Sequence, residues 1–326
     1  MIVLKKHAQV EFIKGYNRTC VYDISRRDYE FIPNNIANLF LNKVHIIESD
    51  LDYTDPDIKY WIDLLFEKEY IFRIPKKLSK RFINIDRHFI SPNNIEFAII
   101  EIDSEVDFEI FSKLESLFCR HIALKFNEIK EIDNLLNIII SNYFFESVSI
   151  ILDKEIAIEE QNYLKNKYLN LYKIEKHKID TSNKYFRPDF RINIEIFNEA
   201  LKYNVYHNRR IYINKAGYFS FGINDKNFSK EKFLNTSDFD SELWRVSKDK
   251  CLVCKECEFR YMCIDNRIPK KNQNNMYYYV DECSYNPYIS KWNNDKDYYT
   301  LSQIGIKYPD FTVDENEIKE IIEEIW

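Results

Sequence analysis

The chain has 326 residues, of which 45% are hydrophobic and 31% are charged, and its net charge is −6. This composition is that of a globular protein and argues against extended disorder. The acidic balance gives no electrostatic reason to expect nucleic acid or an anionic membrane surface as a partner. With only four glycines, the chain contains neither a Walker loop nor a dinucleotide-binding fingerprint.

The start of the sequence bears on localisation. Lys5, Lys6 and His7 are not followed by an apolar segment with a small-residue cleavage site, and no apolar stretch is long enough to span a membrane. We therefore expect a soluble, cytoplasmic protein without a membrane partner. Its cysteine thiols should stay reduced in that compartment.

Residues 1–78 are predicted to form a small α+β module. Alternating apolar residues on both sides of a turn at 15–17 predict a β-hairpin. Asn34 and Asp55 with Pro56 mark the starts of two short amphipathic helices, and an apolar stretch at 70–74 predicts a closing strand. This order of strands, helices and a closing strand predicts a winged-helix-like module.

Residues 79–190 are predicted to contain repeated βα units. Apolar stretches at 97–102, 122–126 and 148–152 are typical of buried parallel strands. Helical spacing after the first two strands predicts the order βαβαβα. Three or four such units predict a parallel sheet resembling part of an open (β/α) barrel, because a closed barrel needs eight.

Residues 191–326 are predicted to form a C-terminal domain. A helix is expected over 192–206, a hairpin over 210–221 around Gly217, and a short amphipathic helix over 317–326. The predicted fold class is therefore α/β, with three consecutive domains.

Cysteines are concentrated in the last third of the chain. Five of the seven fall within 33 residues, at Cys251, Cys254, Cys257, Cys263 and Cys283. In a reducing compartment this spacing favours metal ligation over disulfides. Thiolates separated by two residues can converge on one ion, and four of them suit either an iron–sulfur cluster or tetrahedral zinc. The spacing alone does not choose between these metals.

The stretch from Cys254 through Cys263 to Asp265 resembles the SPASM domain, the C-terminal cluster-binding extension of many peptide-modifying radical enzymes. Nearly the whole chain is similar to the SPASM peptide maturase of grasp-with-spasm systems. This similarity is carried by the hairpin around Gly217 and by residues 14–16, 22–24, 32–34, 197–210, 244–249 and 283–288.

The resemblance implies a SPASM-type C-terminal domain and a role in maturing ribosomally made, post-translationally modified peptides (RiPP biosynthesis). The implied partners are a precursor peptide and an ATP-grasp ligase. The implied ligands of one 4Fe-4S cluster are Cys254, Cys257, Cys263 and Cys283, with Cys251 as a substitute and zinc as the alternative metal. The ligand set for a second SPASM cluster is incomplete.

Radical chemistry requires three clustered cysteines near the start of the barrel, and this chain lacks them. Before Cys251 there are only Cys20 and Cys119, which are too far apart in sequence for a three-ligand loop. The βα region is then expected to be a reduced radical-enzyme barrel. The sequence assigns no catalytic residue, so an enzyme and a non-catalytic adaptor that presents the peptide to the ligase both remain open. A zinc-binding interaction module is a third reading.

Two groups of residues are candidates for peptide binding. Maturases of this kind add the leader peptide as an extra strand to an N-terminal module, and the resemblance places Val21, Tyr22 and Asp23 near that edge. An ordinary structural subdomain is the alternative. Beside the cysteines, aromatic and arginine side chains could anchor a peptide or could simply shield the sulfurs from water; they include Arg260, Tyr261 and Arg267.

Overall fold

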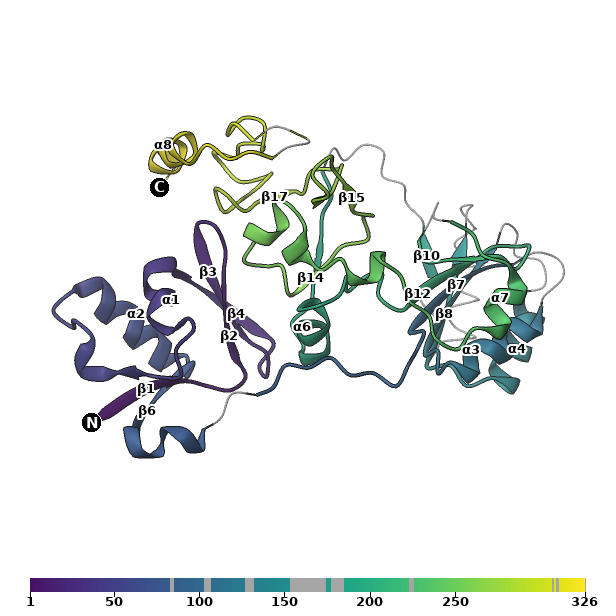
Figure 1. The fold of residues 1–326 in the computed structure, drawn as a ribbon, viewed down its shortest axis with the longest axis horizontal. Coiled ribbons are helices and arrows are strands. Elements are labelled where there is room, and N and C mark those ends of the chain that lie inside the picture. The colour runs from purple at the N-terminus through teal and green to yellow at the C-terminus, as the bar shows by residue number, and fades with distance from the viewer. Residues whose placement is uncertain are drawn as a thin grey trace. The chain divides into compact units, whose positions relative to one another are not determined.

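A computed structural model describes residues 1–82, 85–102, 107–126, 132–152, 174–176, 185–222, 226–306, 308 and 311–325 (Figure 1). The fold is mixed α/β, as predicted. Two compact units are present, and each is described by itself. Unit 1 comprises residues 1–89, 184–205 and 246–326, and unit 2 comprises 90–183 and 206–245. The chain passes from unit 1 into unit 2 twice, so both units are assembled from non-consecutive segments, whereas the sequence predicts three consecutive domains.

The N-terminal part of unit 1 contains two three-stranded antiparallel sheets, with strand orders β5-β1-β6 and β2-β3-β4. The predicted hairpin, both helices and the closing strand are confirmed. The elements are β1 (Ile2–Lys6), β2 (Val10–Lys14), β3 (Arg18–Asp23), β4 (Asp28–Pro33), α1 (Asn34–Phe40), β5 (Ile46–Ile47), α2 (Pro56–Glu67), β6 (Ile71–Pro75) and 3₁₀ turns at Glu48–Asp50 and Lys76–Arg81.

Local chemistry explains where α2 begins. The Asp55 side chain accepts hydrogen bonds from the backbone N–H groups of Asp57 and Ile58, and Pro56 occupies the first turn. Ile62 and Leu65 form the buried face of the helix. Both join an apolar core with residues of β1 to β4 and α1.

The placement of the predicted peptide edge is wrong. Val21, Tyr22 and Asp23 belong to β3, which pairs with β2 on one side and β4 on the other, and all three are buried. The edges of this sheet are β2 and β4. The sequence analysis missed β4 because Asp28 and Glu30 interrupt the apolar pattern that usually reveals a strand.

The remainder of unit 1 is built from short elements joined by turns. Helix α6 ends six residues before the predicted helix does, because turns replace the helix after Leu201. The elements are β11 (Asp189–Phe190), α6 (Ile194–Ala200), β14 (Cys263–Ile264), β15 (Lys270–Lys271), β16 (Tyr277–Tyr278), β17 (Tyr285–Asn286), β18 (Lys291–Trp292), α8 (Glu315–Ile325) and 3₁₀ turns at Lys248–Lys250 and Cys254–Glu256.

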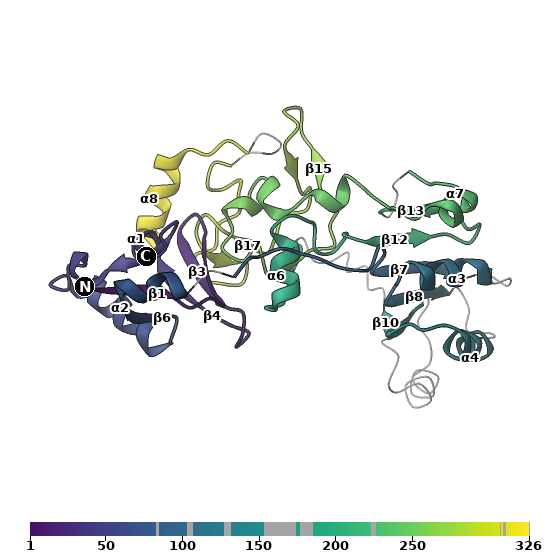
Figure 2. The ribbon, with the colours of Figure 1, turned by 60° about the horizontal axis from the view of Figure 1, so that its bottom comes forward.

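Unit 2 is built on a six-stranded sheet of order β10-β9-β8-β7-β12-β13, in which only β13 runs antiparallel to its neighbour. Figure 2 shows α3 and α4 alongside it. The elements are β7 (Phe97–Ile102), α3 (Phe108–Ser116), β8 (His121–Phe126), α4 (Ile132–Asn142), β9 (Ser147–Leu152), β10 (Ile174–Lys176), β12 (Arg210–Ile213), β13 (Phe219–Ser220), α7 (Lys230–Asn235) and a 3₁₀ turn at Leu243–Arg245.

The predicted parallel strands and the first two helices of unit 2 are confirmed. The third helix of the βαβαβα prediction falls outside the described residues. The hairpin at 210–221 forms, but it belongs to this sheet and not to the C-terminal domain, since β12 pairs in parallel with β7. The apolar core of the unit includes Ile122, Leu124 and Ile211.

None of the helices in the described part of the chain is long and apolar enough to cross a membrane.

Candidate metal centre

A tight double turn shapes the first three cysteines of the cluster. Val253 adopts φ 68° and ψ −54°, and Cys254 N donates to Leu252 O at 2.8 Å, which together define a γ-turn. A 3₁₀ turn follows and is closed by Cys257 N donating to Cys254 O at 3.0 Å. A β-branched residue at positive φ is unfavourable, so local backbone strain lies between Cys251 and Cys254.

Residues 186–190 pair with both of the later cysteines. Phe190 pairs with Cys263 in the β11–β14 ladder, and Phe186 forms a bridge with Cys283. The backbone N–H of Tyr285 donates to the Cys283 sulfur at 3.5 Å. Such an N–H group stabilises a thiolate and is a usual companion of cysteine metal ligands.

The four predicted ligands influence one another electrostatically. Burial, the charge of Glu258 and the thiols of Cys263 and Cys254 raise the pKa of Cys257 well above its usual value. Burial raises the pKa of Cys283 to about 11, with Cys254 adding to the effect and Arg267 opposing it. Ionisation of one thiol thus disfavours ionisation of its neighbours, and a bound cation would remove this repulsion.

A buried ion network adjoins the thiols. Asp265 accepts hydrogen bonds from Arg267 at 2.9 and 2.6 Å and forms an ion pair with Lys248. Burial opposes the carboxylate charge, but these two cations hold the pKa of Asp265 well below its usual range. Lys248 and Arg267 therefore both contact the Asp265 carboxylate in the interior of the unit.

Lys248 is buried beside groups that favour its charged form. Burial disfavours the ammonium, yet the charges of Tyr279, Cys254, Asp265 and Cys263 raise its pKa well above the usual value. Its Nζ also lies 4.2 Å from the Tyr279 ring centroid. The Lys248 ammonium therefore lies within electrostatic reach of the thiols and favours their ionised form.

The other cysteines differ from these four. Cys251 is fully buried, packs with Cys254 and Tyr279, and directs its Sγ to Ser247 O at 3.6 Å. Cys20 is buried under the β2–β3 hairpin, and Cys119 is buried in the core of unit 2. Within the described ranges, no three histidine, cysteine, aspartate or glutamate side chains are arranged to hold a metal ion.

The predicted peptide anchors beside the cysteines are engaged inside unit 1. Arg260 donates to Asp249 at 2.8 Å and to the carbonyl of Lys14 at 2.8 Å, and the Tyr261 hydroxyl donates to Asp249 at 2.8 Å. Arg267 binds Asp265 and lies over two aromatic rings. These contacts favour the reading in which the side chains enclose the cysteine segment.

Sequence reasoning missed Lys248, Asp265 and Glu258. Nothing local distinguishes a buried Lys248 from a surface lysine, and its partner Asp265 is 17 residues away. Glu258 is fully buried although it stands among charged residues that suggest a solvated surface. The only local signal is that Asp265 and Glu258 lie within two residues of a predicted ligand.

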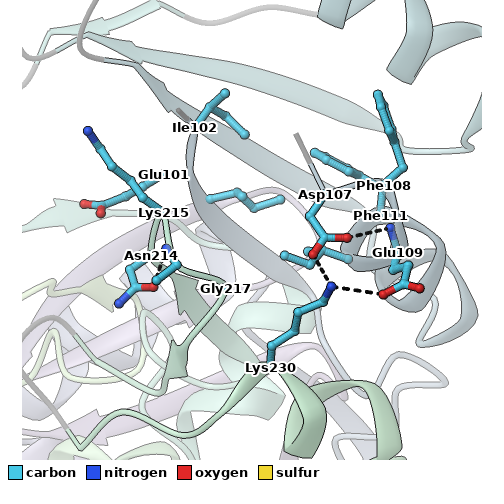
Figure 3. A pocket seen from close by; sticks show the side chains of 13 residues that line it. Glu101, Ile102, Asp107, Phe108, Glu109, Phe111, Asn214, Lys215, Gly217 and Lys230 are labelled. Atoms are coloured by element: carbon cyan, nitrogen blue, oxygen red, sulfur yellow. Dashed lines mark hydrogen bonds and ion pairs between the residues drawn. The ribbon is translucent and has the colours of Figure 1, made fainter. Parts of the chain in front are cut away.

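A pocket of about 630 Å3 in unit 2 is a second candidate site (Figure 3). It lies where β7 and β12 end, an edge of parallel sheets at which ligands often bind. The Lys230 ammonium forms ion pairs with Asp107 and Glu109, so these three charged side chains of the pocket are already paired with one another. The pocket contains none of the predicted metal ligands.

Neither a family model, nor a curated protein, nor a solved structure matches this chain.

Proposed function

We propose that residues 251–283 hold one metal centre ligated by Cys254, Cys257, Cys263 and Cys283. The observation that carries the proposal is the buried ammonium of Lys248, which pairs with Asp265 and lies within electrostatic reach of Cys254 and Cys263. A buried cation favours anions around it, and a four-thiolate centre is anionic.

By ligand type the donor set suits both a 4Fe-4S cluster and zinc, although the described side chains are not arranged around a metal position. Sulfur-only ligation suits either metal, and the N–H of Tyr285 aimed at Cys283 would stabilise either centre. A cluster would supply one-electron redox chemistry, whereas zinc would supply structure alone. We favour the cluster because of the resemblance to SPASM domains.

The test is the iron, acid-labile sulfide and zinc content of anaerobically purified protein. We expect about four irons and four sulfides per chain. Cys257→Ala should lose them, while Cys119→Ala, which removes a buried thiol of unit 2, should keep them. One zinc without sulfide would replace the cluster by a structural centre. No bound metal in the intact chain would refute the site.

At the level of the whole chain, we propose a peptide maturase component of a grasp-with-spasm system that acts with an ATP-grasp ligase on a ribosomally made precursor. The support is the resemblance of the sequence. The alternative is a non-catalytic adaptor that presents the precursor to the ligase. Peptide mass distinguishes them: a product formed by the ligase alone and only accelerated by this chain indicates the adaptor, whereas a mass change requiring the chain indicates an enzyme.

The edge strand β4 is the surface we propose for the precursor. Tyr29 N and Phe31 N donate to the side chains of Asp28 and Glu30, at 2.8 and 3.1 Å. Alternate N–H groups of a strand point the same way, so these two face away from β3. An added strand would pair with both, replacing the carboxylates as partners.

Tyr29→Pro tests this edge. Proline removes an outward N–H without breaking the β3–β4 ladder, so the fold should persist while affinity for the peptide falls. Tyr29→Ala removes the same side chain but keeps the N–H and should bind normally. The measurement is calorimetry with a synthetic copy of a short peptide encoded beside the gene of this chain. Equal affinity of both variants and wild type would exclude the β4 edge.

A further inference from the structure

The tip of the β2–β3 hairpin is fixed to the cysteine segment by its backbone. Tyr16 N donates to Glu256 O at 2.8 Å, and Arg260 Nη1 donates to Lys14 O at 2.8 Å. The tip is also tied to α1, whose Asn34 amide donates to Gly15 O at 3.2 Å. The hairpin, α1 and the cysteine segment are thus one hydrogen-bonded assembly.

Side chains make a second connection two residues further along each segment, at Arg18 and Glu258. Arg18 Nε donates to Glu258 Oε1 at 2.7 Å, the Tyr285 hydroxyl donates to the same oxygen at 2.5 Å, and the Tyr22 hydroxyl donates to Glu258 O at 2.6 Å. A Cβ atom on Gly15 would lie 2.8 Å from Glu258 Oε2. Only glycine therefore allows this close approach of hairpin and carboxylate.

The contacts fall on the residues between the proposed ligands. Glu256 and Glu258 flank Cys257, and Arg260 lies between Cys257 and Cys263. Binding of a metal by these thiols would fix the backbone on both sides of each contact. The hairpin would then be held by a rigid segment instead of a free one.

The same contacts continue to the edge strand. The Arg18 guanidinium, fixed by Glu258, lies 3.5 Å from the ring centroid of Phe31, and the Phe31 ring packs against Phe259 at 5.5 Å. Phe31 is one of the two residues whose N–H faces away from β3. An unbroken path of contacts therefore leads from Cys257 through Glu258 and Arg18 to the outer edge of β4.

We propose that metal loading of the cysteine segment orders the β2–β3–β4 sheet through Arg18 and Glu258, so that the peptide-accepting edge is competent only in the loaded protein. Arg18 and Glu258 are positioning residues in this device. The inference rests on the proposed metal centre, but it concerns regulation of the edge and does not require any reaction.

Hydrogen exchange of the full chain, followed by mass spectrometry, tests the proposal. The chain is stripped with a chelator and reloaded with either ferrous iron and sulfide or Zn²⁺, and bound metal is measured in each sample. Loading should slow exchange in β2 to β4 roughly tenfold, which corresponds to about 1.4 kcal/mol. In Arg18→Met, loading should still protect residues 251–267 but no longer β2 to β4.

Two further variants make the result specific. Gly15→Ala would place a methyl group 2.8 Å from Glu258 Oε2 and 2.9 Å from Arg18 O, at the junction itself, and should also disconnect the sheet from loading. Arg26→Met removes an arginine that pairs with Asp23 and Glu69 and does not contact the cysteine segment, so it should respond as wild type does. Metal that binds without slowing exchange in β2 to β4 would overturn the coupling and leave the metal centre intact. A chain that binds neither probe would overturn both.

Discussion

Arg18 Nε lies 2.7 Å from Oε1 of Glu258, a residue 240 positions later in the sequence. The Glu258 side chain is fully buried and that of Arg18 is 23% exposed, so solvent screens the pair only partly. The N-terminal module and the cysteine segment therefore stabilise one another. Deleting residues 1–75 would expose the cysteine segment as well as remove a peptide surface, which makes point variants the better test of either role.

Arg18→Met should lower the free energy of unfolding by about 3 kcal/mol, because it leaves a buried carboxylate without its cation. Adding Glu258→Gln should recover part of this loss, since the double variant buries no unpaired charge. Urea denaturation followed by tryptophan fluorescence measures both. Lys319→Met, at an exposed ion pair with Glu323, should change stability by less than about 0.5 kcal/mol. Equal effects of the two single variants would show that the Arg18 pair is effectively solvated.

Lys248→Met should weaken metal binding by about 10- to 100-fold, the usual effect of removing a group that supports metal ligands. The physical reason is the loss of a buried cation that acts electrostatically on Cys254 and Cys263. Competition with a coloured chelator gives the affinity. The matched control is Lys255→Met, which removes the same charge from an exposed position between Cys254 and Cys257. A loss in the control as large as in Lys248→Met would mean that general charge, and not the buried network, sets the affinity.

Unit 2 should lose stability as the pH falls, through Glu96 and His121. Burial would raise the pKa of Glu96, but Arg120, Arg209 and Asn93 outweigh it and lower the pKa. Burial lowers the pKa of His121. Both groups bind fewer protons when folded, so stability rises with pH. The His121 contribution is complete above about pH 6.5 and the Glu96 contribution above about pH 4.5, and each is lost as the pH falls through the folded pKa.

Hydrogen exchange of β7 and β8 between pH 4 and 8, corrected for intrinsic rates, measures this dependence. Glu96→Gln should remove the loss below about pH 4.5, and His121→Asn the loss beginning near pH 6.5. Glu109→Gln alters an exposed carboxylate of the same unit and should keep both steps. A wild-type profile that is flat between pH 4 and 7 would contradict the prediction.

The elements that the sequence predicted are those with a mostly apolar or clearly periodic pattern. The strands at 97–102 and 148–152 each contain a single polar residue, Glu101 or Ser149, and α2 has both a capping residue and helical spacing. Periodicity does not say which sheet a strand joins, so the pairing of β12 with β7 could not be foreseen. For the same reason the sequence does not show that β3 is the central strand of its sheet.

The candidate site was predictable only in its sulfur ligands. The spacing of cysteines identifies them as candidate ligands, whereas no such spacing identifies the charged residues around them. Lys248, Asp265 and Glu258 look like surface residues in the sequence and become functional candidates only through burial and long-range pairing. The sequence suggests peptide anchors among the aromatic and arginine side chains near the cysteines. It does not reveal that Arg260 already has partners within the fold.

Replacing Phe118 with glycine should raise the stability of the chain, whereas replacing Arg18 with methionine should lower it. It follows α3 at φ 57°, where its N–H donates to Glu115 O and Cys119 N donates to Leu114 O, a helix-ending geometry that favours glycine. Its side chain is 66% exposed, so the ring contributes little burial. Phe118→Gly should therefore raise the free energy of unfolding by about 0.5–1 kcal/mol through relief of backbone strain. Urea denaturation of the full chain measures the change.

Phe118→Ala separates the backbone from the ring, because alanine keeps the strained φ and removes only the aromatic group. It should leave stability within about 0.5 kcal/mol of wild type. If both variants destabilise the chain equally, the Phe118 ring packs in solution and the strain argument fails. If Phe118→Gly stabilises and Phe118→Ala does not, the chain carries an exposed aromatic residue at a position where glycine would be more stable, and stability alone does not account for it.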